Sequence, residues 1–140
     1  MDVAVLGASG NAGSEITRDL ARRGHSVRAI ARKPDAIPDL PGVTRLAGDA
    51  HDPGTLATLI TGADAVISAL HFDVTADTLL AALHEAGVGR LLVTGGAASL
   101  EVAPGVRLID SPDFPAEWRE FAAEQAAWAQ ALAAAGLLPR

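Results

Sequence analysis

The sequence contains no cysteine and no tyrosine among its 140 residues. The lack of cysteine excludes disulfides, thiolate metal ligands and a cysteine nucleophile, and it is compatible with a reducing compartment. The lack of tyrosine removes one of the common proton donors of enzyme active sites. Nothing else in the sequence points to a metal site, so no metal is expected.

Positive charge and long apolar segments are also scarce. The formal net charge is -6 and Lys33 is the only lysine, which argues against nucleic acid as the main partner. No apolar run approaches the length of a membrane span, and the first residues look like a folded strand rather than a signal peptide. We therefore expect a cytoplasmic protein that binds neither nucleic acid nor membrane.

The most informative segment is at the start of the chain. An apolar strand at 2–6 runs into a glycine turn, Gly7-Ala8-Ser9-Gly10-Asn11-Ala12-Gly13, and an amphipathic stretch follows, with Ile16 and Leu20 on one side. A strand, a tight glycine turn and a helix start together favour a bound pyrophosphate, because the first N–H groups and the dipole of the helix attract an anion. Glycine lets the phosphate approach the backbone. The alternative is a turn of the same kind without a nucleotide.

The residues after the second expected strand, at 24–31, bear on the choice of cofactor. This position usually carries an acidic residue that binds a ribose 2′-hydroxyl, but here it reads Ala31-Arg32-Lys33-Pro34. Two adjacent cations suit a 2′-phosphate instead. The sequence therefore favours NADP(H) over NAD(H), and the alternative is that Arg32 and Lys33 belong to a solvated loop.

Strands and helices alternate along the rest of the chain. Further strands are expected at 43–48, 63–70 and 90–94, and helices are expected from Pro53 to a stop at Gly62, at 75–86 and at 116–135. This alternation predicts a single Rossmann-like α/β domain over 1–140, a doubly wound parallel sheet with strand order 3-2-1-4-5. A long connection at 95–115, with a short strand at 106–109, precedes the last helix.

The last helix carries an aromatic and apolar stripe at helical spacing: Trp118, Phe121, Gln125, Trp128 and Leu132. We interpret this stripe as core or subunit contact rather than as a cofactor site.

Residues that follow the other strands complete the candidate cofactor site. Asp49 can accept a hydrogen bond from the adenine amino group and Ala50 leaves room for the ring, although Asp49 could equally cap the turn before Pro53. The ends of the fourth and fifth strands are expected near the central ribose and the nicotinamide. The predicted cofactor-binding residues are Gly7, Ser9, Gly10, Asn11, Ala12, Gly13, Arg32, Lys33, Asp49, Ala50, Ala69, Leu70, Thr94 and Gly95.

Three residues are candidates for contact with the substrate or for catalysis, and the sequence does not choose among them. Thr94, with Gly95 and Gly96, would set the nicotinamide face. His71 lies just past the fourth strand and could act as an acid, or it could simply be a loop residue. Ser111 could contact the substrate or could cap a helix before Pro112.

These segments resemble the atypical short-chain dehydrogenases with an NAD(P)H-binding, NmrA-like fold. The closer likeness is to the subgroup described as NADH-flavin reductases, related in fold to biliverdin reductase B. The resemblance lies in GASGNAG at 7–13, AIARKP at 29–34, GDAHDP at 48–53, ADAVISAL at 63–70 and the segment 91–118. It implies NADP(H) contacts from Gly7, Ser9, Gly10, Asn11, Arg32, Asp49 and Thr94.

The chain departs from this family in two respects. The Tyr-x-x-x-Lys pair of classical short-chain dehydrogenases is absent, which suits hydride transfer to a flavin better than carbonyl reduction. Relatives continue past the last helix into at least one further strand, so we expect the usual later strands to be lacking. A bare sheet edge beside an apolar helix would favour a homodimer.

These observations lead to two hypotheses, beside the third possibility of a shortened domain that binds no ligand well. The first is an NADP(H)-dependent oxidoreductase that passes hydride to a small-molecule acceptor, a flavin or a similar planar compound. The second is a non-catalytic NAD(P)-binding module that senses redox state.

Overall fold

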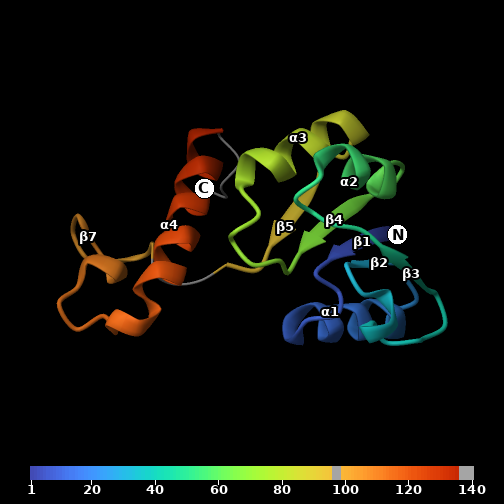
Figure 1. Ribbon diagram of the computed structural model, residues 1–140, viewed down its shortest axis with the longest axis horizontal. Coiled ribbons are helices and arrows are strands. Elements are labelled where there is room, and N and C mark those ends of the chain that lie inside the picture. Colours follow the sequence, from blue (N-terminus) through green and yellow to red (C-terminus); the bar gives the residue numbers. More distant parts are fainter. Residues whose placement is uncertain (96–98, 136–140) are drawn as a thin grey trace.

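The computed structural model describes residues 1–95 and 99–135 (Figure 1). In chain order its strands and α-helices are β1 (Asp2–Leu6), α1 (Asn11–Arg22), β2 (Ser26–Ala31), β3 (Val43–Ala47), α2 (Pro53–Ile60), β4 (Ala65–Ser68), α3 (Ala76–Ala86), β5 (Leu91–Val93), β6 (Glu101–Ala103), β7 (Val106–Arg107) and α4 (Arg119–Ala134). Short 3₁₀ turns cover Pro34–Ala36, Leu108–Asp110 and Ala116–Trp118.

Five parallel strands form the main sheet in the order β3-β2-β1-β4-β5, so the predicted fold class and strand order are confirmed. β1 is central and pairs with β2 on one side and β4 on the other, with Leu6 opposite Ile30 and Ser68. All the strands end at the same edge of the sheet, which is where ligands bind in open α/β folds.

The helices cover both faces of the sheet, with α1 on one face and α2 and α3 on the other (Figure 1). Alternation along the strands divides the core accordingly. Ala4 and Leu6 of β1 pack with α2 and α3, whereas Val5 packs on the α1 side against Ile16 and Leu20. The near-continuous apolar strands are what a sheet buried on both faces requires.

The ends of α2 and α3 follow from their local sequences. Pro53 occupies the first turn of α2, and the Asp52 side chain accepts hydrogen bonds from the backbone N–H groups of the next turn. Thr75 caps α3 in the same way, and Gly87 ends it with φ of 71°. The predicted boundaries of α3 are therefore correct to within one residue.

The segment between β5 and α4 differs in detail from the prediction. The expected strand at 106–109 is shortened to β7, which pairs antiparallel with β6, and its last residues enter a 3₁₀ turn. The last helix begins at Arg119 rather than at Ala116, because Ala116–Trp118 makes a 3₁₀ turn first. This hairpin and its turns form a lobe away from the sheet (Figure 1).

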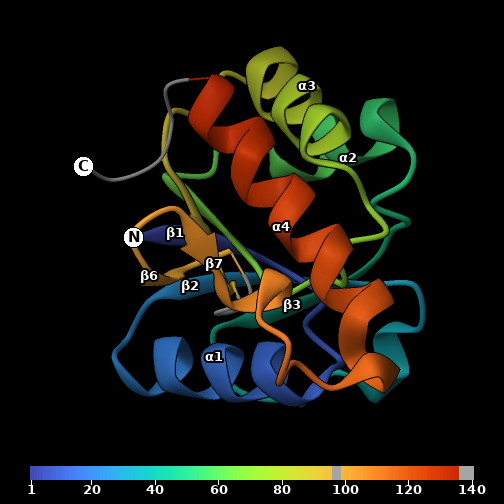
Figure 2. The ribbon, with the colours of Figure 1, turned by 90° about the vertical axis from the view of Figure 1, so that its left-hand side faces the viewer.

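α4 returns from the lobe and packs beside α3 (Figure 2). Of the interpretation of its stripe as core or subunit contact, the core reading is confirmed for the second half of the helix. Gln125, Trp128 and Leu132 are buried, whereas the Trp118 and Phe121 side chains are 62% and 51% exposed. The Trp128 indole N–H donates a hydrogen bond to the carbonyl oxygen of Val74, which ties the helix to the loop after β4.

A hollow of about 1030 Å³, the α3–α4 hollow, lies between α3, β5 and α4. Its walls are mostly apolar and include Leu92 of β5, whose side chain is 44% exposed. Within the described ranges, none of the helices has the length and apolarity needed to cross a bilayer.

Candidate functional site

The turn between β1 and α1 is so tightly packed that two of its positions require glycine. Gly7 has φ of +73°, and a Cβ atom there would lie 2.7 Å from the carbonyl oxygen of Ala69. A Cβ atom on Gly13 would lie 2.0 Å from the carbonyl oxygen of Gly7. Real Cβ atoms do not come this close to backbone, so glycine is needed for β1, β4 and α1 to meet at this point.

Hydrogen bonds fix the same turn against β2. The backbone N–H groups of Gly7 and Ala8 both donate to the carbonyl oxygen of Ile30, each at 3.1 Å. On the other side of the turn, the buried Thr17 hydroxyl donates to the carbonyl oxygen of Gly13 at 2.8 Å. The first turn of α1 is therefore held rigidly at the carboxyl edge of the sheet.

The start of α1 differs chemically from the starts of α2 and α3. Gly10, the residue before α1, has no side chain to cap it, and the first turn carries no acidic residue. α2 and α3 begin instead with capping side chains, Asp52 and Thr75. No side chain of residues 1–95 and 99–135 caps the first N–H groups of α1, and an anion placed there would be stabilised by them and by the helix dipole.

A crevice of about 180 Å³ opens beyond the ends of β1 to β4, beside this turn. Many of the predicted cofactor-binding residues line it: Gly7, Ser9, Gly10, Arg32, Asp49, Ala50, Ala69 and Leu70. The candidate His71 lines it as well. Four strand ends and the loops that follow them, far apart in the sequence, thus contribute to one cavity.

The other predicted residues lie outside the walls of this crevice. Asn11, Ala12 and Gly13 form the first turn of α1, and Lys33 precedes the 3₁₀ turn after β2. The backbone N–H and the hydroxyl of Thr94 both donate hydrogen bonds to the carbonyl oxygen of Ser68, at the end of β4. Gly95 lines the α3–α4 hollow. Ser111 ends a 3₁₀ turn in the lobe, and Gly96 lies outside the described residues.

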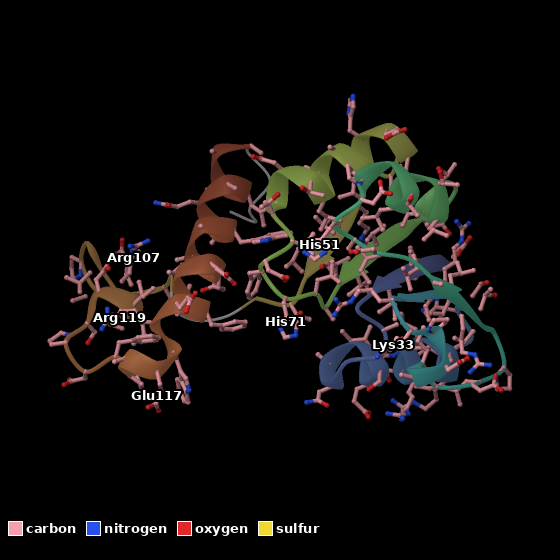
Figure 3. The ribbon with its side chains drawn as sticks, viewed as in Figure 1. Lys33, His51, His71, Arg107, Glu117 and Arg119 are labelled. Carbon is pink, nitrogen blue, oxygen red and sulfur yellow. The ribbon has the colours of Figure 1, made fainter. Side chains whose placement is uncertain are left out.

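Sequence reasoning missed a cluster of three titratable residues in the crevice. The His51 ring lies 2.8 Å from Asp49 through Nδ1 and 3.3 Å from Asp73 through Nε2. All three residues line the crevice, and Figure 3 labels His51 on the loop after β3. Asp52 caps the following helix, whereas Asp49 caps the turn before Pro53, as the sequence alternative predicts. The Asp49 Oδ1 accepts the backbone N–H of His51 at 3.0 Å and also contacts the His51 ring.

Hydrogen bonds perturb the ionisation of this cluster. The pKa of Asp49 is lowered, first by the hydrogen bond from the backbone N–H of His51, then by the His51 ring, with a smaller contribution from Arg32. The pKa of His51 is raised above its usual value, mainly by the hydrogen bond with Asp49 and further by Asp73. Hydrogen bonds to a charged form favour that form, so the cluster is drawn toward an imidazolium between two carboxylates.

Aromatic rings gather where the loop after β4 meets α4. The His71 ring is 6.3 Å from the Phe121 ring in an edge-on arrangement, and Phe72 lies 5.8 Å from Phe121. Phe72 also packs against Trp128 at 6.0 Å. Figure 3 shows His71 between the crevice side of the sheet and the lobe that carries Arg107, Glu117 and Arg119. An exposed aromatic face therefore lies next to one wall of the crevice.

The lobe is held together by its own polar contacts. Arg119 donates to the carbonyl oxygens of Ile109 and Phe114, and its guanidinium lies 5.7 Å from the centre of the Phe114 ring. Arg107 pairs with Asp110. Among the residues that the structure describes, no group of three or more histidine or acidic side chains is placed to hold a metal ion, the Asp49–His51–Asp73 cluster included.

Comparison with known proteins agrees with this geometry. A protein-family model described as NAD(P)H-binding matches residues 7–137. The uncharacterized protein YwnB of Bacillus subtilis is 38% identical over 135 residues, which cover 89% of this chain and 62% of YwnB. The chain thus spans less than two thirds of the length of this relative.

Solved structures extend the comparison. A protein from Streptococcus pneumoniae described as a "putative NADH-flavin reductase" is 30% identical with a TM-score of 0.81, over 99% of this chain and 68% of that one. A "putative epimerase" from Bacteroides thetaiotaomicron is 32% identical with a TM-score of 0.84, over 92% and 62%. Fold, glycine turn and family match agree, and the chain belongs to the NAD(P)H-binding family, as an atypical short-chain dehydrogenase of the NmrA-like type.

Proposed function

We propose that the protein is an NADP(H)-dependent oxidoreductase that transfers hydride to a flavin or a similar planar acceptor. The observation that carries this proposal is the glycine turn at the uncapped start of α1, beside a crevice lined by the ends of four strands. When bound, the nicotinamide cofactor would supply the hydride. The residues of the chain would bind and orient the two rings and keep water away from them.

The dinucleotide would extend along the crevice, with each part beside the residues that the sequence assigns to it. The pyrophosphate would lie against the backbone of Gly7, Ser9 and Gly10, beside the start of α1, which no side chain of the described residues caps. The adenine end would lie by Asp49 and Ala50, and the central ribose by Ala69 and Leu70.

The preference for NADP(H) rests on the charges after β2. Arg32 lines the crevice, and Lys33 follows it, with no acidic residue at the end of β2. A guanidinium can bind a phosphate through two hydrogen bonds. The negative charge of Asp49 disfavours an additional phosphate at the adenine end of the crevice, and the neighbouring His51 offsets part of the charge of Asp49.

The residues available at the substrate side of the crevice favour a planar acceptor. No tyrosine is available to protonate an alkoxide, whereas reduction of a flavin ring needs only a proton that water can supply. The Phe121 ring is half exposed and lies beside His71 at the crevice wall, so it offers a face on which a flat ring can stack.

A steady-state assay tests the function directly. Oxidation of NADPH is followed at fixed protein concentration with riboflavin or flavin mononucleotide as acceptor, and the rate is compared with that of free flavin and NADPH. We expect turnover above the uncatalysed rate. Tight NADPH binding without turnover would instead support the second hypothesis, a module that senses redox state.

Replacing Arg32 with alanine tests the cofactor preference. Loss of a charge-assisted contact with the 2′-phosphate should weaken NADPH binding about tenfold and leave NADH binding nearly unchanged. Fluorescence titration of the wild type and Arg32→Ala with both cofactors measures this difference.

A matched control is Arg45→Ala, which removes an arginine from β3 that pairs with Asp39. That variant should retain the wild-type preference. Equal losses of NADPH and NADH affinity in Arg32→Ala would contradict the proposed role of Arg32.

A further inference from the structure

The loops after β3 and β4 meet beside the crevice through the apolar contacts of the core and through charged side chains. His51 comes from the first loop and Asp73 from the second, 22 positions later in the chain, and their side chains are in ion-pair contact. Asp49 holds the opposite nitrogen of the same ring. One imidazole therefore connects two walls of the cavity.

We propose that His51 is a dinucleotide-binding residue that acts as a pH-dependent clasp: when protonated it joins the loops after β3 and β4 and offsets two carboxylates that would otherwise repel the cofactor phosphates. The inference rests on the proposed dinucleotide binding and adds a residue and a pH dependence to it.

The two contacts of the ring explain why protonation matters: Nδ1 is hydrogen-bonded to Asp49, and Nε2 lies 3.3 Å from Asp73. A neutral imidazole has one N–H and can donate to only one of the two aspartates, whereas the imidazolium donates to both. Loss of the proton therefore breaks one of the two contacts. It also changes the summed charge of the cluster from -1 to -2, beside the place where a polyanion binds.

The direction of the pH dependence follows from the charged groups that face His51. Asp49 and Asp73 contact it directly, Arg32 at the end of β2 acts on Asp49, and Asp52 at the start of α2 interacts with Asp49 as well. Asp49 and Asp73 raise the pKa of His51, so the clasp is fully formed below the usual value of 6.5 and is lost as the pH rises through the raised value. Affinity for a dinucleotide should fall over the same range.

Calorimetric titration with NAD⁺ between pH 5.5 and 8.5 tests the proposal. NAD⁺ lacks the 2′-phosphate, whose own ionisation near pH 6 would add to the signal. We expect the dissociation constant of the wild type to rise about threefold with pH, the size expected of one unit charge a few ångströms away at the protein surface. In His51→Gln the constant should not change with pH.

Two further variants make the result specific. His25 contacts the amino group of Met1 at the start of β2, away from the crevice, so His25→Gln should keep the wild-type pH profile. In Asp73→Asn the second carboxylate is removed, and the pKa of His51, measured by NMR on the unliganded protein, should fall relative to the wild type.

The outcomes separate this proposal from the function on which it rests. Binding of NAD⁺ that is independent of pH, or an equal pH dependence in His51→Gln, overturns the clasp and leaves the dinucleotide site intact. An unchanged His51 pKa in Asp73→Asn overturns the bridge. No binding of NAD⁺ or NADP⁺ at any pH would overturn the proposed function and the clasp together.

Discussion

Replacing Gly13 with alanine should destabilise the protein by about 3 kcal/mol, the upper part of the range for overpacking. The added Cβ would lie 2.0 Å from the carbonyl oxygen of Gly7 and 2.7 Å from its carbonyl carbon, and neither atom can move without displacing β1 or α1. Chemical denaturation followed by circular dichroism measures the loss. Because the displaced turn is also the proposed phosphate site, dinucleotide affinity should fall on the order of tenfold in the fraction that folds.

The matched control is Gly54→Ala in the first turn of α2. A Cβ there meets nothing closer than an Asp52 carboxylate oxygen at 3.6 Å, so the variant should be slightly stabilised, by about 0.4–1 kcal/mol, through reduced freedom of the unfolded chain. A Gly13→Ala protein as stable as wild type would show that β1 and α1 are not packed as tightly as described.

The second large effect is expected at Trp128. Truncation to alanine removes a ring that is 4% exposed and packs against Phe72, and it also leaves the buried carbonyl of Val74 without its donor. We expect a loss of about 3–5 kcal/mol in the free energy of unfolding. Trp128→Phe keeps most of the packing and should cost about 1–3 kcal/mol, chiefly for the unsatisfied carbonyl.

Trp118→Ala provides the comparison within the same segment. Its side chain is 62% exposed, so truncation should change the free energy of unfolding by no more than about 0.5 kcal/mol. Similar losses for the two tryptophans would contradict the description of α4 as a helix docked by one end. Since Val74 lines the crevice, Trp128→Ala should also weaken dinucleotide binding, whereas Trp118→Ala should not.

The sheet and the first turn could be predicted because their signals are local. The apolar strand 2–6, the glycines that follow and the alternation of strands and helices are each readable within one short window, and handedness then leaves one strand order. The gathering of residues from several strand ends around one crevice was predictable for the same reason. In a parallel sheet all of these ends lie at one edge.

Other features depend on contacts between distant residues. The sequence around His51 does not indicate that Asp73 will be its neighbour. The two residues meet because α2 and α3 pack side by side, which brings the loops before them together. Asp49 and Asp52 lie three residues apart, and the folded backbone decides their roles: Asp52 accepts the first N–H groups of α2, and Asp49 accepts the N–H of His51. Periodicity could not reveal that the first part of α4 extends past the body, which leaves Trp118 and Phe121 exposed.

The positions of the two tryptophans make intrinsic fluorescence a probe of one segment of the protein. Both belong to α4 or the turn before it, and with no tyrosine in the chain the intrinsic ultraviolet emission comes almost entirely from this segment. A soluble quencher such as iodide should reach Trp118 and spare Trp128 in the native state. If α4 undocks before the sheet melts, emission and circular dichroism will give two separate transitions, and coincident curves will mean that helix and sheet unfold as one unit.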